Sequence, residues 1–139
     1  MSEGLTEKLS HTPYTEVTNN IRVSVLPEHL EEASDISAGV YAFNYTIRLE
    51  NLGTEIVQLL ERHWVIYSGD FRLAEVVGPG VVGENPVLEP FSSFEYQSSA
   101  IIQHPYGSMH GSYTFRSQDG KFFQVVIPKF DLLYPVIYH

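Results

Sequence analysis

The chain has no cysteine among its 139 residues. This excludes disulfides, thiolate metal sites and thiol nucleophiles, and a chain of this length can bury enough surface to fold without them. The absence also fits a reducing compartment. The amino-terminal residues have neither the basic patch nor the apolar stretch of a signal peptide, so we expect a cytoplasmic protein.

Basic residues and long apolar runs are scarce as well. Lysine and arginine number 8 against 17 aspartate and glutamate residues, which gives a net charge of −9. Such a field repels nucleic acid and anionic membrane surfaces, so we expect no nucleic-acid partner. No apolar run approaches the ~20 residues that span a bilayer, and we expect a protein that is not membrane-spanning.

Helical periodicity is nearly absent, and alternation takes its place. The one helix candidate is residues 27–34, which would make about two turns and is expected to fray into a loop. In residues 41–51, aromatic and branched side chains alternate with more polar ones, the pattern of a strand with one dry face. Other stretches of the same kind lie at 21–25, 57–68, 72–77, 94–97, 112–116 and 122–127.

Turn signals separate these stretches. Residues 51–54 connect the longest one to the next, and the pair Asp119-Gly120 favours a tight hairpin. We therefore predict an all-β fold, an antiparallel β-sandwich of about seven strands of the immunoglobulin or fibronectin-III type. Residues 1–18 lack apolar periodicity and are expected to be a disordered tail, followed by one sandwich domain over residues 19–139.

The aromatic residues on the dry faces of these strands are the expected core. Phe43 and Tyr45 belong to the longest alternating stretch, and Trp64, the only tryptophan, falls in the middle of the next one. We expect all three side chains to fill the space between the sheets. Tyr96 follows a proline-containing corner, and its hydroxyl is expected to bond to a loop backbone, as in immunoglobulin-like sandwiches.

Residues 78–83 contain Gly78-x-Gly80-x-x-Gly83, the spacing of dinucleotide-binding loops. Such a loop must open a helix, because the free amides at the helix start hold the phosphate, and no helical pattern follows Gly83. We therefore reject the dinucleotide interpretation. Two alternatives stay open: the glycines permit a bend with positive φ, or their amides cup a small anion such as phosphate, with help from Arg62 or Arg72.

The six histidines show no spacing typical of a metal site. His104, His110 and His139 could meet in space and are retained as a candidate metal site. His63, which precedes Trp64, is expected to be a hydrogen-bonded core or edge residue. The serine and acidic residues form no nucleophile elbow and no acid-base pair at a fixed spacing, so we expect no enzymatic activity and no cofactor.

Several motifs together resemble the ApaG family, a small bacterial domain that is also joined to larger eukaryotic proteins. They are IRVSV, FNYTIRLEN-x-G, VQLLERHW, EVVGPGVVGENPVLEP, MHGSYTF, FFQVVIPKFDL and the closing His139, and they run from Ile21 to the end of the chain. Two positions depart from the family pattern. Tyr67-Ser68 replaces a Thr-Asp pair, and Phe91 follows Pro90 where a flexible glycine is usual.

The resemblance implies a fibronectin-III-like sandwich, in agreement with the strand pattern, and a link to cobalt tolerance and magnesium efflux. From the residues and the resemblance together we predict a noncatalytic binding domain, which affects cations only indirectly and binds a protein partner or a small anion. The alternative is a phosphate-, pyrophosphate- or nucleotide-binding sensor or enzyme that uses residues 78–83. An exposed edge strand could also pair with a second copy of the chain to give a homo-oligomer.

Overall fold

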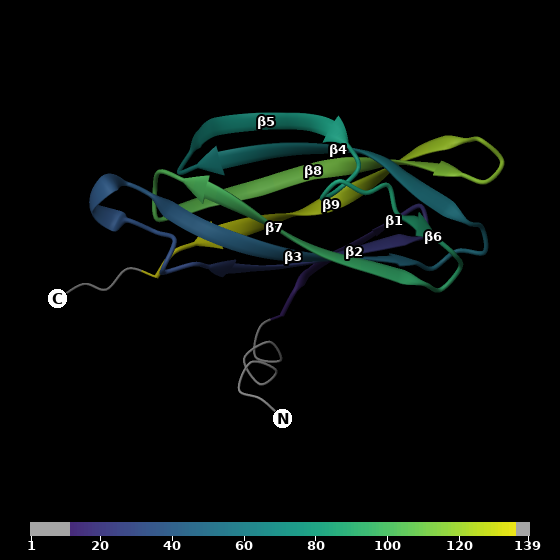
Figure 1. Cartoon of the computed structure of the whole chain (residues 1–139), viewed down its shortest axis with the longest axis horizontal. Coiled ribbons are helices and arrows are strands. Elements are labelled where there is room, and N and C mark those ends of the chain that lie inside the picture. Colours follow the sequence, from purple (N-terminus) through teal and green to yellow (C-terminus); the bar gives the residue numbers. More distant parts are fainter. Residues whose placement is uncertain (1–11, 136–139) are drawn as a thin grey trace, which may run out of the picture.

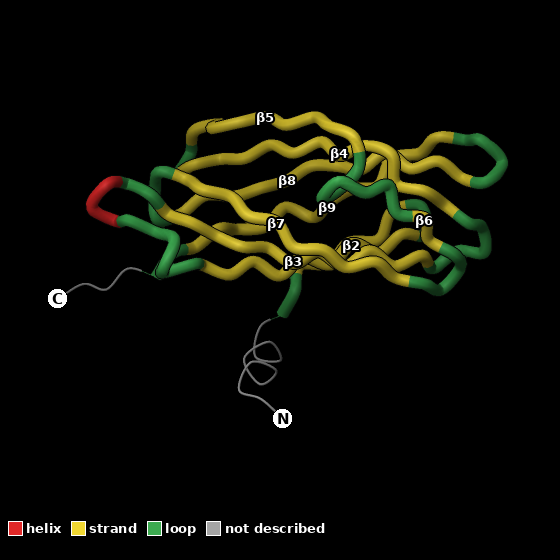
Figure 2. Tube along the Cα trace, viewed as in Figure 1, coloured by secondary structure: helices red, strands yellow, loops and turns green. Residues whose placement is uncertain are grey.

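Two antiparallel β-sheets pack face to face in the computed structural model, which describes residues 12–135 (Figure 1). The strands are β1 (Tyr14–Thr18), β2 (Ile21–His29), β3 (Tyr41–Asn51), β4 (Val57–Ser68), β5 (Phe71–Pro79), β6 (Val87–Leu88), β7 (Ser93–Ile102), β8 (Tyr106–Ser117) and β9 (Phe122–Leu133). One sheet has the order β1-β2-β3-β7; the other has the order β5-β4-β8-β9, with β6 paired to β4. The predicted all-β antiparallel sandwich is confirmed, and strands make up most of the trace in Figure 2.

β3 follows the predicted alternation. Phe43, Tyr45, Ile47 and Leu49 are buried, whereas Arg48 between the last two is exposed. The strand pairs along its length with β2 on one side and with β7 on the other. Because both neighbours satisfy its backbone, the alternation alone decides which side chains enter the core.

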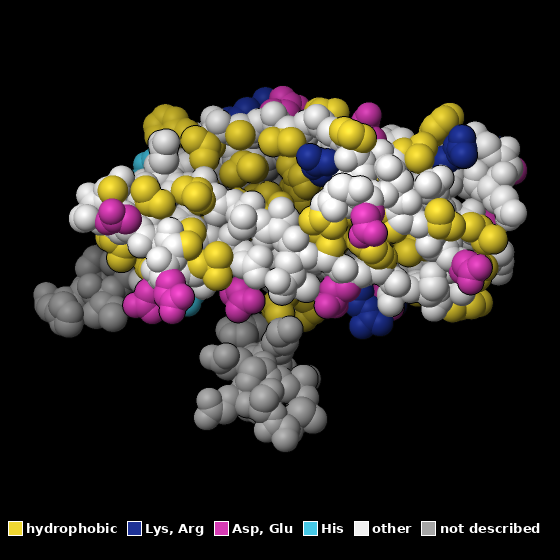
Figure 3. Space-filling model, viewed as in Figure 1, with side chains coloured by type: hydrophobic (Ala, Val, Ile, Leu, Met, Phe, Trp, Pro, Cys, Tyr) yellow, Lys and Arg dark blue, Asp and Glu magenta, His cyan; other side chains and the backbone are white. Residues whose placement is uncertain are grey.

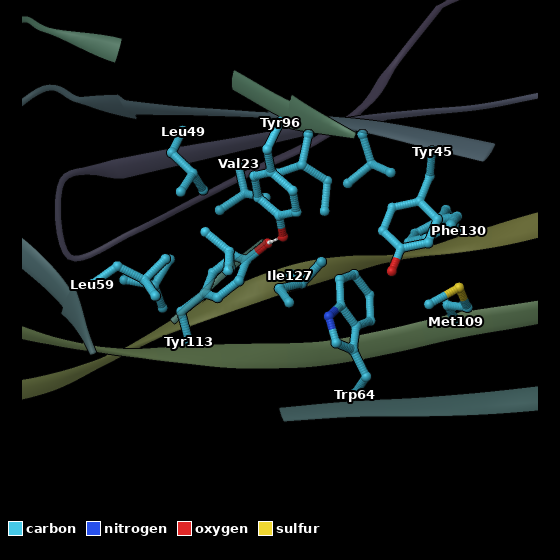
Figure 4. Close-up of a cluster of buried hydrophobic side chains, with 14 of the residues drawn as sticks. Val23, Tyr45, Leu49, Leu59, Trp64, Tyr96, Met109, Tyr113, Ile127 and Phe130 are labelled. Atoms are coloured by element: carbon cyan, nitrogen blue, oxygen red, sulfur yellow. Dashed lines mark hydrogen bonds between the residues drawn. The ribbon is translucent and has the colours of Figure 1, made fainter. Parts of the chain in front are cut away.

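Aromatic rings from both sheets fill the core, as Figure 4 shows. Phe43, Tyr45 and Trp64 are all buried, which confirms their predicted place. The Trp64 ring centre lies 5.4 Å from that of Tyr45 in the opposite sheet and 5.9 Å from that of Phe130. Truncating a buried tryptophan to alanine costs about 3–5 kcal/mol, so this contact is a large share of the stability of a domain this size.

Tyr96 does not form the predicted corner. Its hydroxyl lies 2.5 Å from the hydroxyl of Tyr113 inside the core, and not against a loop backbone (Figure 4). The alternation of β7 turns Tyr96 inward, where β8 offers a partner that satisfies the buried phenol without water. Burial raises the pKa of both hydroxyls, so the pair is neutral at physiological pH.

The structure moves the predicted domain boundary and adds strands. β1 and β6 bring the number of strands in residues 12–135 to nine, against about seven predicted. β1 falls inside the predicted disordered tail: it pairs along its whole length with β2, and the Tyr14 ring packs 6.1 Å from that of Phe130. The sequence pattern missed it because its middle residues are exposed and its backbone pairing carries no side-chain signal. Residues 1–11 lie outside the described part.

Residues 27–34 are not helical. Pro27–His29 continue β2 and pair with the first half of β3, which supplies more backbone partners than a short exposed helix could. The helical element that the structure describes is the single 3-10 turn Ile36–Ala38, capped by the carboxylate of Asp35. No helix within residues 12–135 is long and apolar enough to cross a membrane.

Both predicted turns are confirmed. Asn51 ends β3, and its side-chain amide donates to the carbonyls of Glu55 at 2.7 Å and Leu88 at 3.0 Å. The hairpin between β8 and β9 turns at Asp119 and Gly120. Gly120 has a φ of +89°, a conformation that glycine adopts without strain.

Candidate functional site

The two sides of the sandwich end differently. On one side the end of β1 meets β9. The side-chain amide of Asn19, which follows β1, donates to the Gln124 carbonyl at 2.8 Å, and the backbone N–H of Val126 donates to the Thr18 hydroxyl at 3.3 Å. On the other side β5 and β7 each have one paired neighbour and do not pair with each other. A groove of about 330 Å³ lies between them. Figure 3 shows it as a hollow with a hydrophobic floor and a basic side chain at its rim.

Aromatic and aliphatic side chains form most of the groove. Trp64 from β4 and Val76 from β5 belong to one sheet, and Tyr45 and Tyr96 belong to the other. The polar lining side chains are Arg62, Ser98 and Ser99. The volume lies at the lower end of the range for small-ligand sites, and the accessible surface of the lining is about equally polar and apolar.

Arg62 is held at the groove by residues 78–83, which we call the glycine segment. Its Nη1 donates to the carbonyls of Pro79 at 2.8 Å and Gly80 at 3.0 Å. Strand register places Arg62 opposite Gly78, and a Cβ on Gly78 would lie 3.0 Å from Nη2. The missing side chain of Gly78 therefore leaves the space that the guanidinium occupies. Within residues 12–135, Nε and Nη2 have no protein acceptor and stay available as donors.

The positive charge of Arg62 affects the pKa of two tyrosines in the groove. Burial raises the pKa of the Tyr45 hydroxyl, and the nearby Ser98 hydroxyl and the Arg62 guanidinium oppose that rise. The guanidinium also opposes the rise that burial causes in the pKa of Tyr96. Arg62, Tyr45 and Ser98 thus place one positive charge and two hydroxyls together in a half-apolar environment, where an anion interacts more strongly than in water.

The glycine segment forms a bend and no helix start. Gly80, Val82 and Gly83 have φ values of +59°, +44° and +79°. The Gly80 amide donates to the Leu60 carbonyl at 2.9 Å, and Val81 and Glu84 exchange two backbone hydrogen bonds of 2.8 Å. Residues 84–86 lead into β6 without a helix, as the sequence pattern predicts. Since the amides of Gly80 and Val81 already have partners, residues 78–83 offer few donors to an anion.

The predicted anion-binding residues are only partly brought together. Arg62 and Gly83 line the groove, and Gly78 and Gly80 lie against the Arg62 guanidinium without lining it. Arg72 lies near the other end of β5, opposite Tyr67, and its guanidinium is 3.7 Å from the Glu75 carboxylate. It is therefore outside the groove.

The three histidines of the candidate metal site do not form a cluster in the described chain. His104 Nδ1 lies 2.7 Å from the Ser68 hydroxyl, while His110 stacks on Tyr67 with a ring separation of 5.9 Å. His139 lies outside the described residues, so the complete triad stays a prediction. Within residues 12–135 there is no group of three or more histidine, aspartate or glutamate residues that could hold a metal ion.

His63 is a hydrogen-bonded edge residue, as predicted. Its Nε2 lies 2.6 Å from the Glu75 carboxylate on the outer face of the β4-β5 pair. The hydrogen bond from His63 lowers the pKa of Glu75. The pair points away from the groove and does not belong to it.

Sequence reasoning named Arg62 and Gly83 as anion-binding residues and Tyr45 and Trp64 as core residues, but it missed the groove that they line. Ser98 and Ser99 also line it, and no motif marks them. One signal was present: Ser98 lies between Tyr96 and Ala100 on the dry face of β7, where a polar residue is unusual. The remaining residues meet only because of how the two sheets are offset, and spacing along the chain does not encode that offset.

The fold and the groove together define a small antiparallel β-sandwich domain with a ligand-sized groove at its open side. A family model described as the ApaG domain matches residues 31–117. The chain belongs to the ApaG family.

Relatives and solved structures agree with this assignment. Protein ApaG of Thiobacillus denitrificans is 48% identical over 119 residues, which is 86% of this chain and 94% of the relative. Protein ApaG of Mesorhizobium japonicum is 45% identical over 122 residues, 88% of this chain and 94% of the relative. The crystal structure of a Bordetella pertussis protein designated ApaA has a TM-score of 0.80 and 42% identity, over 83% of this chain and 94% of that one.

Proposed function

We propose that this chain is a noncatalytic binding domain that seats an anionic ligand in the groove between β5 and β7. The observation that carries the proposal is Arg62, a cation anchored by two carbonyls at the rim of an aromatic groove. The protein as a whole carries a net charge of −9, so a fixed positive charge in a cavity is a specific feature and no part of a general basic surface. A carboxylate or phosphate would meet the free donors of Arg62 and the Ser98 hydroxyl.

The composition of the groove supports a binding role over catalysis. Its lining in the described part of the chain contains no carboxylate and no imidazole that could act as a general base. The hydroxyls of Tyr45 and Tyr96 have raised pKa values, which makes them poor bases and poor nucleophiles near neutral pH. Ser98 and Ser99 therefore lack the neighbour that would activate them.

A pyrophosphate or nucleotide site at residues 78–83 is the less well supported alternative. The amides of Gly80 and Val81 already donate to backbone carbonyls, and Arg62 is the one arginine or lysine among the groove residues of the described chain. Two adjacent phosphates would need more charge than that. In the binding proposal, any effect on cobalt or magnesium is indirect and passes through the bound ligand or a partner.

Arg62→Gln tests the proposal, with Arg48→Gln as the matched control. Arg48 is an exposed arginine of β3 whose side chain lies 4.0 Å from Glu50, on the outer face of the sheet. The probes are acetate, inorganic phosphate, pyrophosphate and 4-phenylbutyrate, followed by calorimetry and by the fluorescence of Trp64, the only tryptophan and a groove residue. We expect at least one anion to bind, with affinity about tenfold weaker in Arg62→Gln and unchanged in Arg48→Gln.

Two results would overturn this function. One is that no anion in the series saturates the wild-type protein. The other is that the two variants lose affinity equally, because the effect would then reflect net charge alone. Arg62→Lys guards against misfolding as the explanation, since it keeps the charge while it loses the forked geometry, and intermediate binding is expected.

A further inference from the structure

Val82 has a backbone conformation that its side chain disfavours. Its φ is +44°, and 53% of its surface is exposed. Positive φ is rare for β-branched residues, and the first central position of such a tight turn is normally asparagine, aspartate or glycine. The following residue, Gly83, is the ordinary choice for its own φ of +79°. Only the valine is unexpected in this turn.

Tertiary contacts hold this turn in place over the groove. Val81 is buried in the core cluster, and its backbone pairs with that of Glu84. Val82 and Gly83 both line the groove. A strained, exposed, apolar side chain adds little to folding, and backbone strain of this kind concentrates at functional sites. At the mouth of the groove, the Val82 side chain can contact the apolar part of a ligand.

The other walls define the kind of ligand. One cation is present, and its Nη1 is shared with two carbonyls, so it matches one acidic group. Ile66 and Val76, which are half-buried, offer apolar surface beside it, and the almost wholly buried Trp64 completes this wall. A groove of about 330 Å³ accommodates a body of roughly drug-like size or smaller.

We propose that the groove selects a small monoanion with an apolar body, and that Val82 is the residue that determines this specificity. The acid group lies at Arg62 and Ser98, the body lies on Ile66 and Val76 next to Trp64, and Val82 covers it from the mouth. This inference rests on the proposed function and adds the ligand class to it. It also explains why an unfavourable residue stands in the turn.

Val82→Asn is the decisive variant, because we expect opposite signs for its effects on stability and binding. Asparagine tolerates positive φ, so the melting temperature should rise by roughly 2–5 °C. Affinity for 4-phenylbutyrate should fall about tenfold, since apolar contact is lost, while affinity for acetate should not change. Phe91→Asn is the matched control: Phe91 has a φ of +63° in a turn outside the groove, so this variant should be more stable and bind normally.

Probe comparisons on the wild-type protein separate the two proposals. We expect 4-phenylbutyrate to bind more tightly than acetate, pyrophosphate or the neutral 4-phenylbutyramide. If pyrophosphate or acetate binds as tightly and still depends on Arg62, the ligand class is wrong and the anion site stands. If 4-phenylbutyrate binds equally well to Val82→Asn, the role of Val82 is wrong. If no probe depends on Arg62, both proposals fail.

Discussion

Two glycines near the groove matter mainly because a side chain in their place would collide with neighbouring atoms, and less because their backbone is flexible. Gly78 makes room for the Arg62 guanidinium, whereas Gly80 lies against the backbone of Glu84. A Cβ on Gly80 would be 2.2 Å from the Glu84 carbonyl oxygen, and its φ is +59°. A spacing that first suggests a phosphate loop thus reflects close packing of one bend.

Gly80→Val should destabilise the protein in the absence of any ligand. The new side chain would clash with backbone that cannot move away and would sit at positive φ, so we expect a loss of about 2 kcal/mol or more in the free energy of unfolding, measured by urea denaturation. Gly83→Ala is the control. A Cβ on Gly83 would meet no other atom within 4 Å, so only the φ penalty of about 1 kcal/mol should remain. Equal stability of the Gly80 variant and wild type would contradict this packing.

The Tyr96-Tyr113 pair predicts a specific response to alkaline pH. Burial raises both pKa values, so above about pH 10 the unfolded chain loses these protons while the folded chain keeps them. Their contribution to stability is therefore complete below about pH 10 and declines as pH rises. We expect a fraction of the tyrosinate absorbance to appear only when the circular dichroism of the sheets is lost.

Tyrosine variants show which residues give the tyrosinate absorbance that appears only on unfolding. Tyr113→Phe should reduce it, and Tyr106→Phe should not, because Tyr106 is 48% exposed and does not belong to the buried pair. Complete tyrosine ionisation with unchanged circular dichroism would show that the pair is accessible to solvent.

At the scale of elements, β1 contributes to the domain although its sequence gives little sign of it. A chain that begins at Asn19 loses the β1-β2 pairing and the contact between Tyr14 and Phe130. Compared with a chain that begins at Thr12, it should be less stable by about 1–3 kcal/mol, as measured by urea denaturation. Identical denaturation midpoints for the two chains would mean that β1 adds no stability.

The elements that sequence reasoning found are those whose side chains alternate in burial. β3 shows this most clearly, because Phe43 through Leu49 face the core at every second position. The sequence pattern did not reveal β1 because most of its residues are exposed, and it did not reveal β6 because that strand is two residues long. The sequence predicted only part of the groove for a related reason: Arg62 and Gly78 are strand neighbours, but Ser98 meets them only through the packing of separate sheets.

For the molecule as a whole, the unequal sides of the sandwich matter most. β1 and β9 close one side through direct hydrogen bonds, and β5 and β7 leave the other side open over the core. The groove floor is consequently the side of the core itself, so that Trp64 packs against Phe130 and also lines the groove. A ligand there would contact the side of the packed core and would need little rearrangement of the protein.

The most direct test of an anion site in the groove is a nitrogen-15 NMR titration of the whole chain with 4-phenylbutyrate. We expect the largest shifts to fall on the Trp64 indole and on the amides of Val82 and Ser98, and to need about tenfold more ligand in Arg62→Gln. Shifts centred on the closed side, around Thr18 and Val126, or no shifts at all, would contradict the site.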